Sequence, residues 1–290
     1  MQVVPRILRP VLYRTLLFFG KETDMNLEEV YGIKDEIEQI KKTYEIFDEN
    51  RRLSRCKAAR VEFLTNIRYI EKYLKPGDRI LDIGAGAGEY SLYFANAGYK
   101  VDALELSERN ISDFHQKMKA EHQINLVQGN AVDLSRYQNA SFDIVLVFGP
   151  LYHLHSESDK LKCISEAKRV CKPDGKLFFS FITNDMVILT EFSYRSDFFL
   201  NGKYDKSTFQ LEDFPFVFHT LASCRTVLSK GGVKPIHEVA SDGISELMEE
   251  KINAMDTESY EQYLKYHYYI CEKKEFLGMT NHLLFVSDNR

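Results

Sequence analysis

The chain has 290 residues, a length that suits one large domain or one domain with substantial additions. Its composition, 44% hydrophobic and 28% charged, excludes a fully disordered protein, a fibrous repeat and a disulfide-held miniature protein. The net charge of −5 gives no basic excess, which disfavours sequence-independent binding of nucleic acid. The five cysteines are scattered and form no C-x-x-C pair, so we expect free thiols in a reducing cytoplasm and no metal.

Residues 1–24 are interpreted as a tail or an upstream extension. They carry arginines and no run of about 20 apolar residues, and no such run occurs anywhere in the chain, so we expect no membrane span. Pro5 and Pro10 also argue against a long helix lying on a membrane surface.

Residues 25–75 are predicted to form an N-terminal helical lid. Apolar residues recur at three-four spacing from Val30 to Phe47, which indicates an amphipathic helix packed on its own domain or forming a dimer seam. A homodimer therefore stays one alternative for the oligomeric state. A second helix is expected after the basic stretch 51–60, and Pro76 with Gly77 ends it.

Residues 76–182 alternate between short apolar runs and helical patterns. Ser107 is a predicted N-cap, and Ser156 with Asp159 is typical of a capping box. Repeated strand–helix–strand units with short links predict a parallel, doubly wound α/β sheet. The five expected strands are 79–83, 99–105, 124–127, 142–148 and 176–182.

The pattern changes after strand five. Nine of the 27 residues from Phe192 to Phe218 are Phe or Tyr, so we expect residues 183–232 to form an aromatic cap packed on the sheet. Residues 233–290 are expected to complete the sheet with strands at 233–239 and 282–286 and with helices at 244–252 and 257–269.

A glycine-rich loop follows the first strand of this region. Asp82 lies two residues before the sequence Gly84-Ala85-Gly86-Ala87-Gly88. Glycines allow the backbone to take positive φ and to approach a ligand closely. The helix behind the loop offers unpaired N–H groups. Glu105 ends the second strand, where an acid can accept both hydroxyls of a ribose. Together these features predict a nucleoside across the carboxyl edge of the sheet.

The loop does not suit a diphosphate. A dinucleotide-binding fold requires a small residue three positions after the second glycine, and this chain has Glu89 there. Asp82 would repel a phosphate but suits a ligand with an ammonium group. No G-K-[ST] follows, which excludes a P-loop. These requirements favour an adenosine that carries an amino-acid tail.

These motifs resemble the class I S-adenosylmethionine-dependent methyltransferases, and the resemblance covers residues 57–182 best. It implies a Rossmann-like, mostly parallel seven-stranded sheet with N-terminal helices and an insertion after strand five. It also implies S-adenosylmethionine as cofactor. Asn130 stands where the family more commonly has Asp, and Lys172 to Gly175 resembles a structural turn before strand five. The implied cofactor-binding residues are Asp82, Gly84, Ala85, Gly86, Gly88, Glu105, Leu106, Asn130, Ala131 and Phe148.

The end of strand four bears on the acceptor. The family members that methylate amide or exocyclic nitrogens often have (D/N)-P-P-(Y/F) there, but this chain has Gly149-Pro150-Leu151-Tyr152-His153. This sequence resembles the branch that acts on small molecules. His153 is a candidate general base or a helix cap, and Tyr152 faces the sulfonium or packs in the core.

Tyr194, Phe198 and Phe199 are our candidates for an apolar acceptor pocket. The expected activity is methyl transfer to an oxygen, nitrogen or carbon of a small molecule. The alternatives are a protein or RNA methyltransferase, a non-catalytic module that binds S-adenosylmethionine, and a nicotinamide oxidoreductase, which Glu89 disfavours.

Overall fold

The computed structural model describes residues 30 and 32–290. The tail predicted for residues 1–24 lies outside the described residues. The strands are β1 (Arg79–Ile83), β2 (Lys100–Glu105), β3 (Ile124–Gln128), β4 (Phe142–Val147), β5 (Cys171–Thr183), β6 (Phe218–His219), β7 (Pro235–Ala240) and β8 (His282–Asp288).

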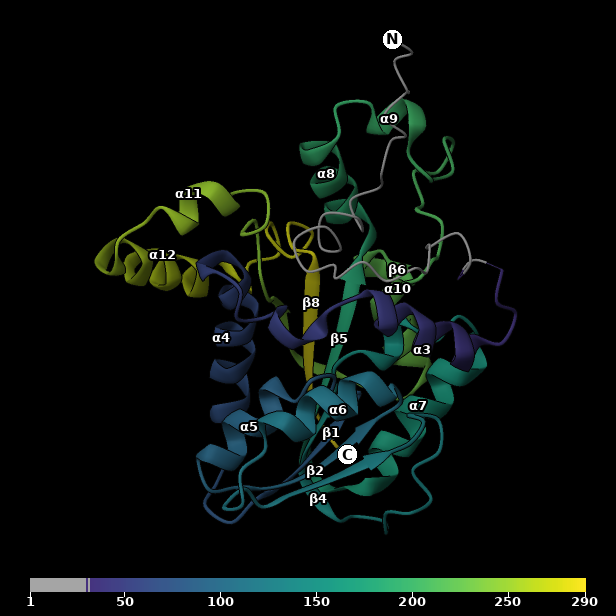
Figure 1. The fold of residues 1–290 in the computed structure, drawn as a ribbon, viewed down its shortest axis with the longest axis vertical. Helices are drawn as coiled ribbons and strands as arrows, with labels where there is room; N and C mark the ends of the chain where they lie inside the picture. The colour runs from purple at the N-terminus through teal and green to yellow at the C-terminus, as the bar shows by residue number, and fades with distance from the viewer. Residues whose placement is uncertain (1–29, 31) are drawn as a thin grey trace.

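The strands form a single sheet in the order β3-β2-β1-β4-β5-β8-β7. The first five strands of this order are parallel, and β8 runs antiparallel to both β5 and β7. The predicted mostly parallel, doubly wound sheet is therefore confirmed (Figure 1). The seven strands of this path are joined by an eighth, β6, which pairs with only the last two residues of β5.

Helices surround this sheet. Their bounds are α3 (Glu36–Ile46), α4 (Lys57–Glu71), α5 (Glu89–Asn96), α6 (Glu108–Lys117), α7 (Glu157–Val170), α8 (Asn184–Tyr194), α9 (Phe198–Asn201), α10 (Leu221–Lys230), α11 (Glu249–Asn253) and α12 (Thr257–Ile270), with short 3-10 helices η1 (Glu49–Arg51) and η2 (Pro150–Tyr152).

Alternate residues of the central strands point to opposite faces, and both faces are buried. On β4, Val145 and Val147 pack with apolar residues of α7 and α10. Ile144 and Leu146 pack with apolar residues of α4 and α5. A parallel sheet covered by helices on both faces has such strands, in which consecutive residues are apolar, as Ile144 to Val147 are here. This packing fixes the carboxyl ends of β1, β2 and β4, where the site lies.

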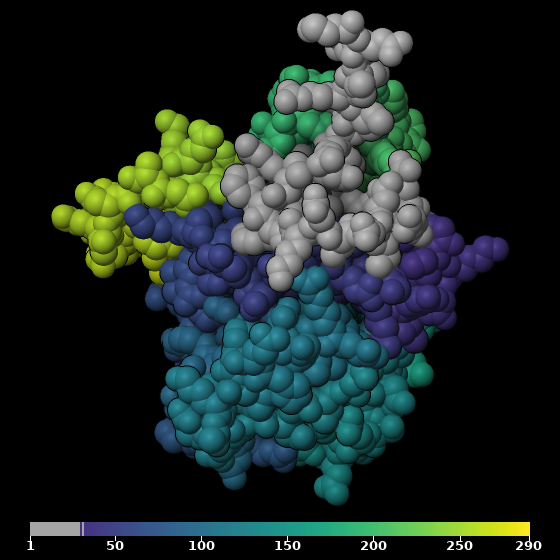
Figure 2. Space-filling model, viewed as in Figure 1, coloured from purple at the N-terminus to yellow at the C-terminus, as the bar shows by residue number. Residues whose placement is uncertain are grey.

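The N-terminal helices lie across these strand ends. In Figure 1, α3 crosses in front of the upper part of the sheet, and Figure 2 shows the residues of this region on the surface above the teal core. Phe47 packs with Phe214 and Phe216 of the aromatic segment after β5. The apolar side of α3 therefore packs on the aromatic segment of the same chain.

Two local predictions differ from the structure. The turn expected at residues 173–175 lies inside β5, where the pairing with β4 jumps from Cys171 to Lys176 and Asp174 takes a φ of 65°. The helix expected over residues 244–252 is reduced to α11, because the preceding residues turn around Asp242, whose buried carboxylate accepts hydrogen bonds from the backbone before β8. The described residues contain no helix that is long and apolar enough to cross a membrane.

Candidate functional site

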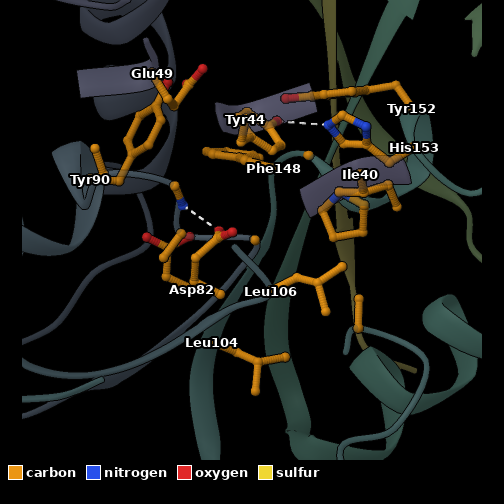
Figure 3. Close-up of a pocket in the computed structure, with 18 of the residues that line it drawn as sticks. Ile40, Tyr44, Glu49, Asp82, Tyr90, Leu104, Leu106, Phe148, Tyr152 and His153 are labelled. Atoms are coloured by element: carbon orange, nitrogen blue, oxygen red, sulfur yellow. Dashed lines mark hydrogen bonds between the residues drawn. The ribbon is translucent and has the colours of Figure 1, made fainter. Parts of the chain in front are cut away.

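A cavity lies at the carboxyl ends of β1, β2 and β4, beneath α3 and η1. It is lined by the glycine-rich loop, by the residues that follow β2, β3 and β4, and by side chains of the N-terminal helices. Figure 3 shows Ile40, Tyr44 and Glu49 approaching from the side opposite the strand ends. The predicted cofactor residues that line it are Asp82, Gly84, Ala85, Gly86, Glu105, Leu106, Asn130, Ala131 and Phe148.

Two glycines of the loop need their lack of a side chain. Gly84 has a φ of 77°, and a Cβ there would lie 2.7 Å from Cδ of Pro150. Gly86 has a φ of 55°, and its Cβ would lie 3.2 Å from Cγ of Glu49. The loop is tied to β2 by the amides of Gly84 and Ala85, which both donate to the carbonyl of Leu104. The backbone thus forms an open cradle.

Gly88 does not line the cavity. It has a φ of 86°, and a Cβ there would lie 2.4 Å from the ring of Phe114 on α6. The glycine is therefore needed for packing between the loop and α6, and the structure gives no support for its predicted contact with a cofactor.

Glu105 lies at the end of β2 and is buried. Its carboxylate accepts hydrogen bonds from the backbone N–H of Gly86 at 2.8 Å and of Ser107 at 2.8 Å. Burial raises the pKa of Glu105, and these hydrogen bonds oppose the rise. Oε1 also accepts from the side-chain NH₂ group of Asn110 at 3.4 Å, so Oε2, which accepts from the N–H of Gly86, is the oxygen that retains a lone pair. Glu105 can therefore brace the glycine loop and still accept from a ligand's hydroxyl groups.

Asp82 has an unsatisfied oxygen in the cavity wall. Oδ2 accepts from the hydroxyl of Ser91 at 2.7 Å, whereas Oδ1 is buried with no hydrogen-bond partner among the described residues. Burial raises the pKa of Asp82 to about 7, and the nearby Glu105 adds to the rise. An ammonium group placed against Oδ1 would satisfy this oxygen and favour the carboxylate.

The residues after β3 supply a different edge of the cavity. Asn130 accepts from the backbone N–H of Val132 through its side-chain oxygen, at 3.1 Å, which leaves that oxygen one lone pair and leaves the NH₂ group free to donate. Phe148, after β4, packs edge-on against Tyr90 with the ring centroids 4.9 Å apart, and both rings line the cavity.

His153 lines the cavity but is poorly suited to accept a proton. Its Nε2 lies 2.7 Å from the hydroxyl of Tyr44 (Figure 3), and its ring packs against Tyr44, Tyr152 and Phe216. Burial, with the charge of His155, lowers the pKa of His153 to about 3. The structure therefore favours a packed, neutral imidazole over the predicted general base.

A second cavity adjoins the first. Four residues line both of them: Tyr44, Glu49, Arg52 and Tyr152. Tyr152, the other predicted catalytic residue, thus lies between the two cavities, with burial raising the pKa of its hydroxyl well above the usual range. The second cavity has a volume of about 200 Å³ and reaches the residues before β8.

The three aromatic residues predicted for the acceptor do not line this second cavity. Phe198 is buried against Tyr204, and Phe199 is 44% exposed on the outside of the cap. Tyr194 donates to Glu246 at 3.3 Å from behind the wall. The aromatic segment contributes Phe216 and Phe218 instead. Composition singled out this segment, but it could not select the residues that line the cavity, because only tertiary packing decides which rings face inward.

Charged side chains that sequence reasoning missed form much of the second cavity. Arg52 donates to Glu62 at 2.6 Å and to Glu49 at 2.7 Å. His282 lies with Nδ1 2.8 Å from Asp242 and 3.4 Å from Glu62. These residues come from η1, α4 and the two ends of the β7–β8 connection, so no local motif brings them together.

Comparison with known proteins agrees with this geometry. Residues 81–179 match the family model described as a methyltransferase domain. The putative methyltransferase YqeM of Bacillus subtilis is 27% identical over 157 residues, 53% of this chain and 58% of that protein. A demethylmenaquinone methyltransferase of Bacillus mycoides is 31% identical over 151 residues, 50% of this chain and 60% of that protein. The chain thus spans somewhat over half the length of these relatives.

Solved structures share the fold. The PH0226 protein from Pyrococcus horikoshii superposes with a TM-score of 0.56 at 18% identity, covering 86% of this chain and 99% of that one. A methyltransferase described as S-adenosylmethionine-dependent, from Archaeoglobus fulgidus, superposes with a TM-score of 0.51 at 15% identity. This match covers 78% of this chain and 93% of that one. The methyltransferase-domain match over residues 81–179 coincides with the sheet order that the sequence predicted, so this part of the chain is a methyltransferase domain with the class I fold, in agreement with the predicted cofactor, S-adenosylmethionine.

Proposed function

We propose that this chain transfers a methyl group from S-adenosylmethionine to a small molecule that enters the second cavity. The observation that carries the proposal is the pair of adjoining cavities, one with a cradle suited to the cofactor and one open beside it. Tyr152 and Arg52 stand where the two cavities meet. The bound cofactor would supply an electrophilic methyl group, and the chain aligns the acceptor with it.

The first cavity fits the cofactor by its own residues. Asp82 offers an unpartnered buried oxygen to the ammonium group, and Glu105 offers acceptors to the ribose hydroxyls. Gly84 and Gly86 leave room for the methionine chain beside the loop. Leu106 and Ala131 would pack on the adenine, and the NH₂ of Asn130 would donate to it.

Several relatives support a small-molecule acceptor. The demethylmenaquinone methyltransferases are named for one, and so is the 27-O-demethylrifamycin SV methyltransferase of Amycolatopsis mediterranei, which is 33% identical over 108 residues, 36% of this chain and 38% of that protein. The second cavity is also partly enclosed by α3 and the aromatic segment, which suits a small molecule more than a folded protein.

We also propose that the cofactor-binding core comprises residues 76–182 and that residues 233–290 complete its sheet. Residues 25–75 would form a lid over this core, and residues 183–232 would form a cap. All five cysteines are free thiols, which supports the cytoplasm as the expected compartment.

The test uses a donor with a tritiated methyl group and a bacterial extract. We expect label to pass to molecules under 1 kDa in the wild type. Gly86→Val should abolish both the transfer and the binding of S-adenosylhomocysteine, because the side chain fills the cradle. Gly98→Val is the matched control: its φ of 89° imposes the same strain, but a Cβ there meets nothing within 4 Å. Label found only in protein or RNA, or no donor binding by the wild type, would contradict the proposal.

A further inference from the structure

The wall of the second cavity holds a histidine that no part of the cofactor site uses. His282 begins β8, and its ring lines this cavity. Its Nδ1 lies 2.8 Å from Oδ2 of Asp242. Its Nε2 makes no hydrogen bond within the described part of the chain. This atom is also not among the fully buried side-chain atoms that lack a hydrogen-bond partner. One ring nitrogen is therefore held and the other is open to a ligand.

Asp242 is fixed more firmly than a carboxylate in an ordinary ion pair. Its Oδ1 accepts from the backbone N–H of Asn281 at 2.9 Å and of His282 at 3.1 Å, and also from the hydroxyl of Thr280. Because β7 and β8 run antiparallel, the residue that follows β7 faces the residues that begin β8. Asp242 thus holds the imidazole in one orientation, and a carboxylate at Nδ1 favours the tautomer with the proton on Nδ1 and a free lone pair on Nε2.

The position of His282 relative to the donor cavity is also suitable. The rings of His282 and Tyr152 meet edge to face, with their centroids 6.4 Å apart, and Tyr152 lines the donor cavity. His282 and Tyr152 both line the second cavity, so an acceptor there could contact the imidazole beside the ring that separates this cavity from the donor cavity. His153, the histidine expected to serve here, has its Nε2 occupied by Tyr44.

We propose that His282 is the general base that removes a proton from the acceptor, with Asp242 as its positioning residue. This inference rests on the proposed function. In the step, the acceptor's X–H bond breaks and its proton passes to Nε2. The electron pair left on X forms the bond to the methyl carbon while the carbon–sulfur bond of the donor breaks, its electrons staying on sulfur. The products are the methylated acceptor, S-adenosylhomocysteine and an imidazolium, which releases its proton to water.

The charges around His282 set the pH at which it is neutral. Burial lowers the pKa of His282, but Glu62 on α4 and Asp242 outweigh burial, so the pKa is raised above its ordinary value of about 6.5. Arg52 opposes the rise, and Glu246 also faces the ring. The base form therefore accumulates only above this raised pKa, and the rate should increase as the pH rises through it.

The first experiment compares variants in the transfer of tritiated methyl to the small-molecule fraction of a bacterial extract. His282→Gln should lower the initial rate by about 10²–10⁴-fold, the usual contribution of a general base, while the affinity for S-adenosylhomocysteine stays unchanged. His237→Gln is the matched control, because His237 also lies beside a carboxylate, Glu272 at 3.0 Å, but lines neither cavity. Equal rates for the wild type and His282→Gln would overturn the inference and leave the proposed function intact.

The second experiment needs no turnover. Nuclear magnetic resonance of the wild type should show the His282 ring titrating above pH 6.5, with the proton on Nδ1 in the neutral form. In Asp242→Asn the pKa of His282 should fall, and the acidic limb of the pH–rate profile should therefore move to lower pH. A merely structural role of Asp242 would not cause this change. A neutral ring with its proton on Nε2 would overturn the inference, as would activity that chelators abolish and Mg²⁺ restores. A wild type that methylates nothing would contradict the proposed function as well.

Discussion

The hydroxyl of Tyr44 lies 2.7 Å from Nε2 of His153, and this hydrogen bond joins α3 to the residue that follows η2, in the wall of the donor cavity (Figure 3). Residues 109 positions apart are thereby connected in the wall of the donor cavity, which both of them line. The contact makes the N-terminal helices part of the site.

Tyr44→Phe should destabilise the protein by about 1–3 kcal/mol, because it leaves Nε2 of the buried His153 without its partner. Tyr93→Phe is the control, since its hydroxyl donates to the exposed Glu71 at 2.7 Å and should change stability by less than about 0.5 kcal/mol. Urea unfolding measures both free energies. Equal losses in the two variants would show that the Tyr44–His153 contact does not secure α3.

His153→Gln should change how stability depends on pH. Because the pKa of His153 is lowered to about 3, the unfolded chain binds one more proton there than the folded chain between about pH 6.5 and 3. Acidification in this window therefore costs the wild type about 1.4 kcal/mol per pH unit through this group. Urea midpoints at pH 7, 6 and 5 should show a shallower loss in the variant. Parallel curves would mean that His153 is not held neutral by burial.

Asp82→Asn should weaken binding of S-adenosylmethionine by about 10–150-fold, the equivalent of about 1.5–3 kcal/mol for hydrogen bonds to a charged group. The pKa of Asp82 is raised to about 7, so the carboxylate that attracts the ammonium group is depleted below that pH. Wild-type affinity should fall as the pH decreases from 7 to 6, whereas the variant should show a flat profile in calorimetry. Asp102→Asn, on the adjacent strand but paired with Arg79, should leave affinity unchanged. A pH-independent wild type would refute this role for Asp82.

The sequence was informative wherever function depends on a local run of residues. The loop from Gly84 to Gly86 and the acid that ends β2 can be recognised because strand, turn and helix follow each other within one segment. Gly88 shows the limit of such a motif. Its position fits the spacing of the glycine-rich loop, but the structure requires a glycine there because a side chain would clash with Phe114. A spacing pattern cannot distinguish a glycine needed for a ligand from one needed for packing.

The second cavity could not be predicted in the same way. Arg52 and Glu62 come from the N-terminal region, whereas Asp242 and His282 come from the far end of the chain. They meet only because β8 inserts between β5 and β7, a topology that periodicity does not reveal. The change of α/β pattern after strand five marks the start of the aromatic segment, but it does not show which of its rings face the cavity.

The most direct test of the account is calorimetric titration of S-adenosylhomocysteine into the wild type, Glu105→Ala and Glu108→Ala. Glu105 lines the donor cavity, whereas Glu108, one turn further along the chain, lies outside the cavity and its side chain is 79% exposed. We expect the wild type and Glu108→Ala to bind alike and Glu105→Ala to bind about 10–150-fold more weakly, through the loss of hydrogen bonds to a charged group. Equal affinity in all three proteins would place the nucleoside elsewhere and contradict the assignment of this cavity.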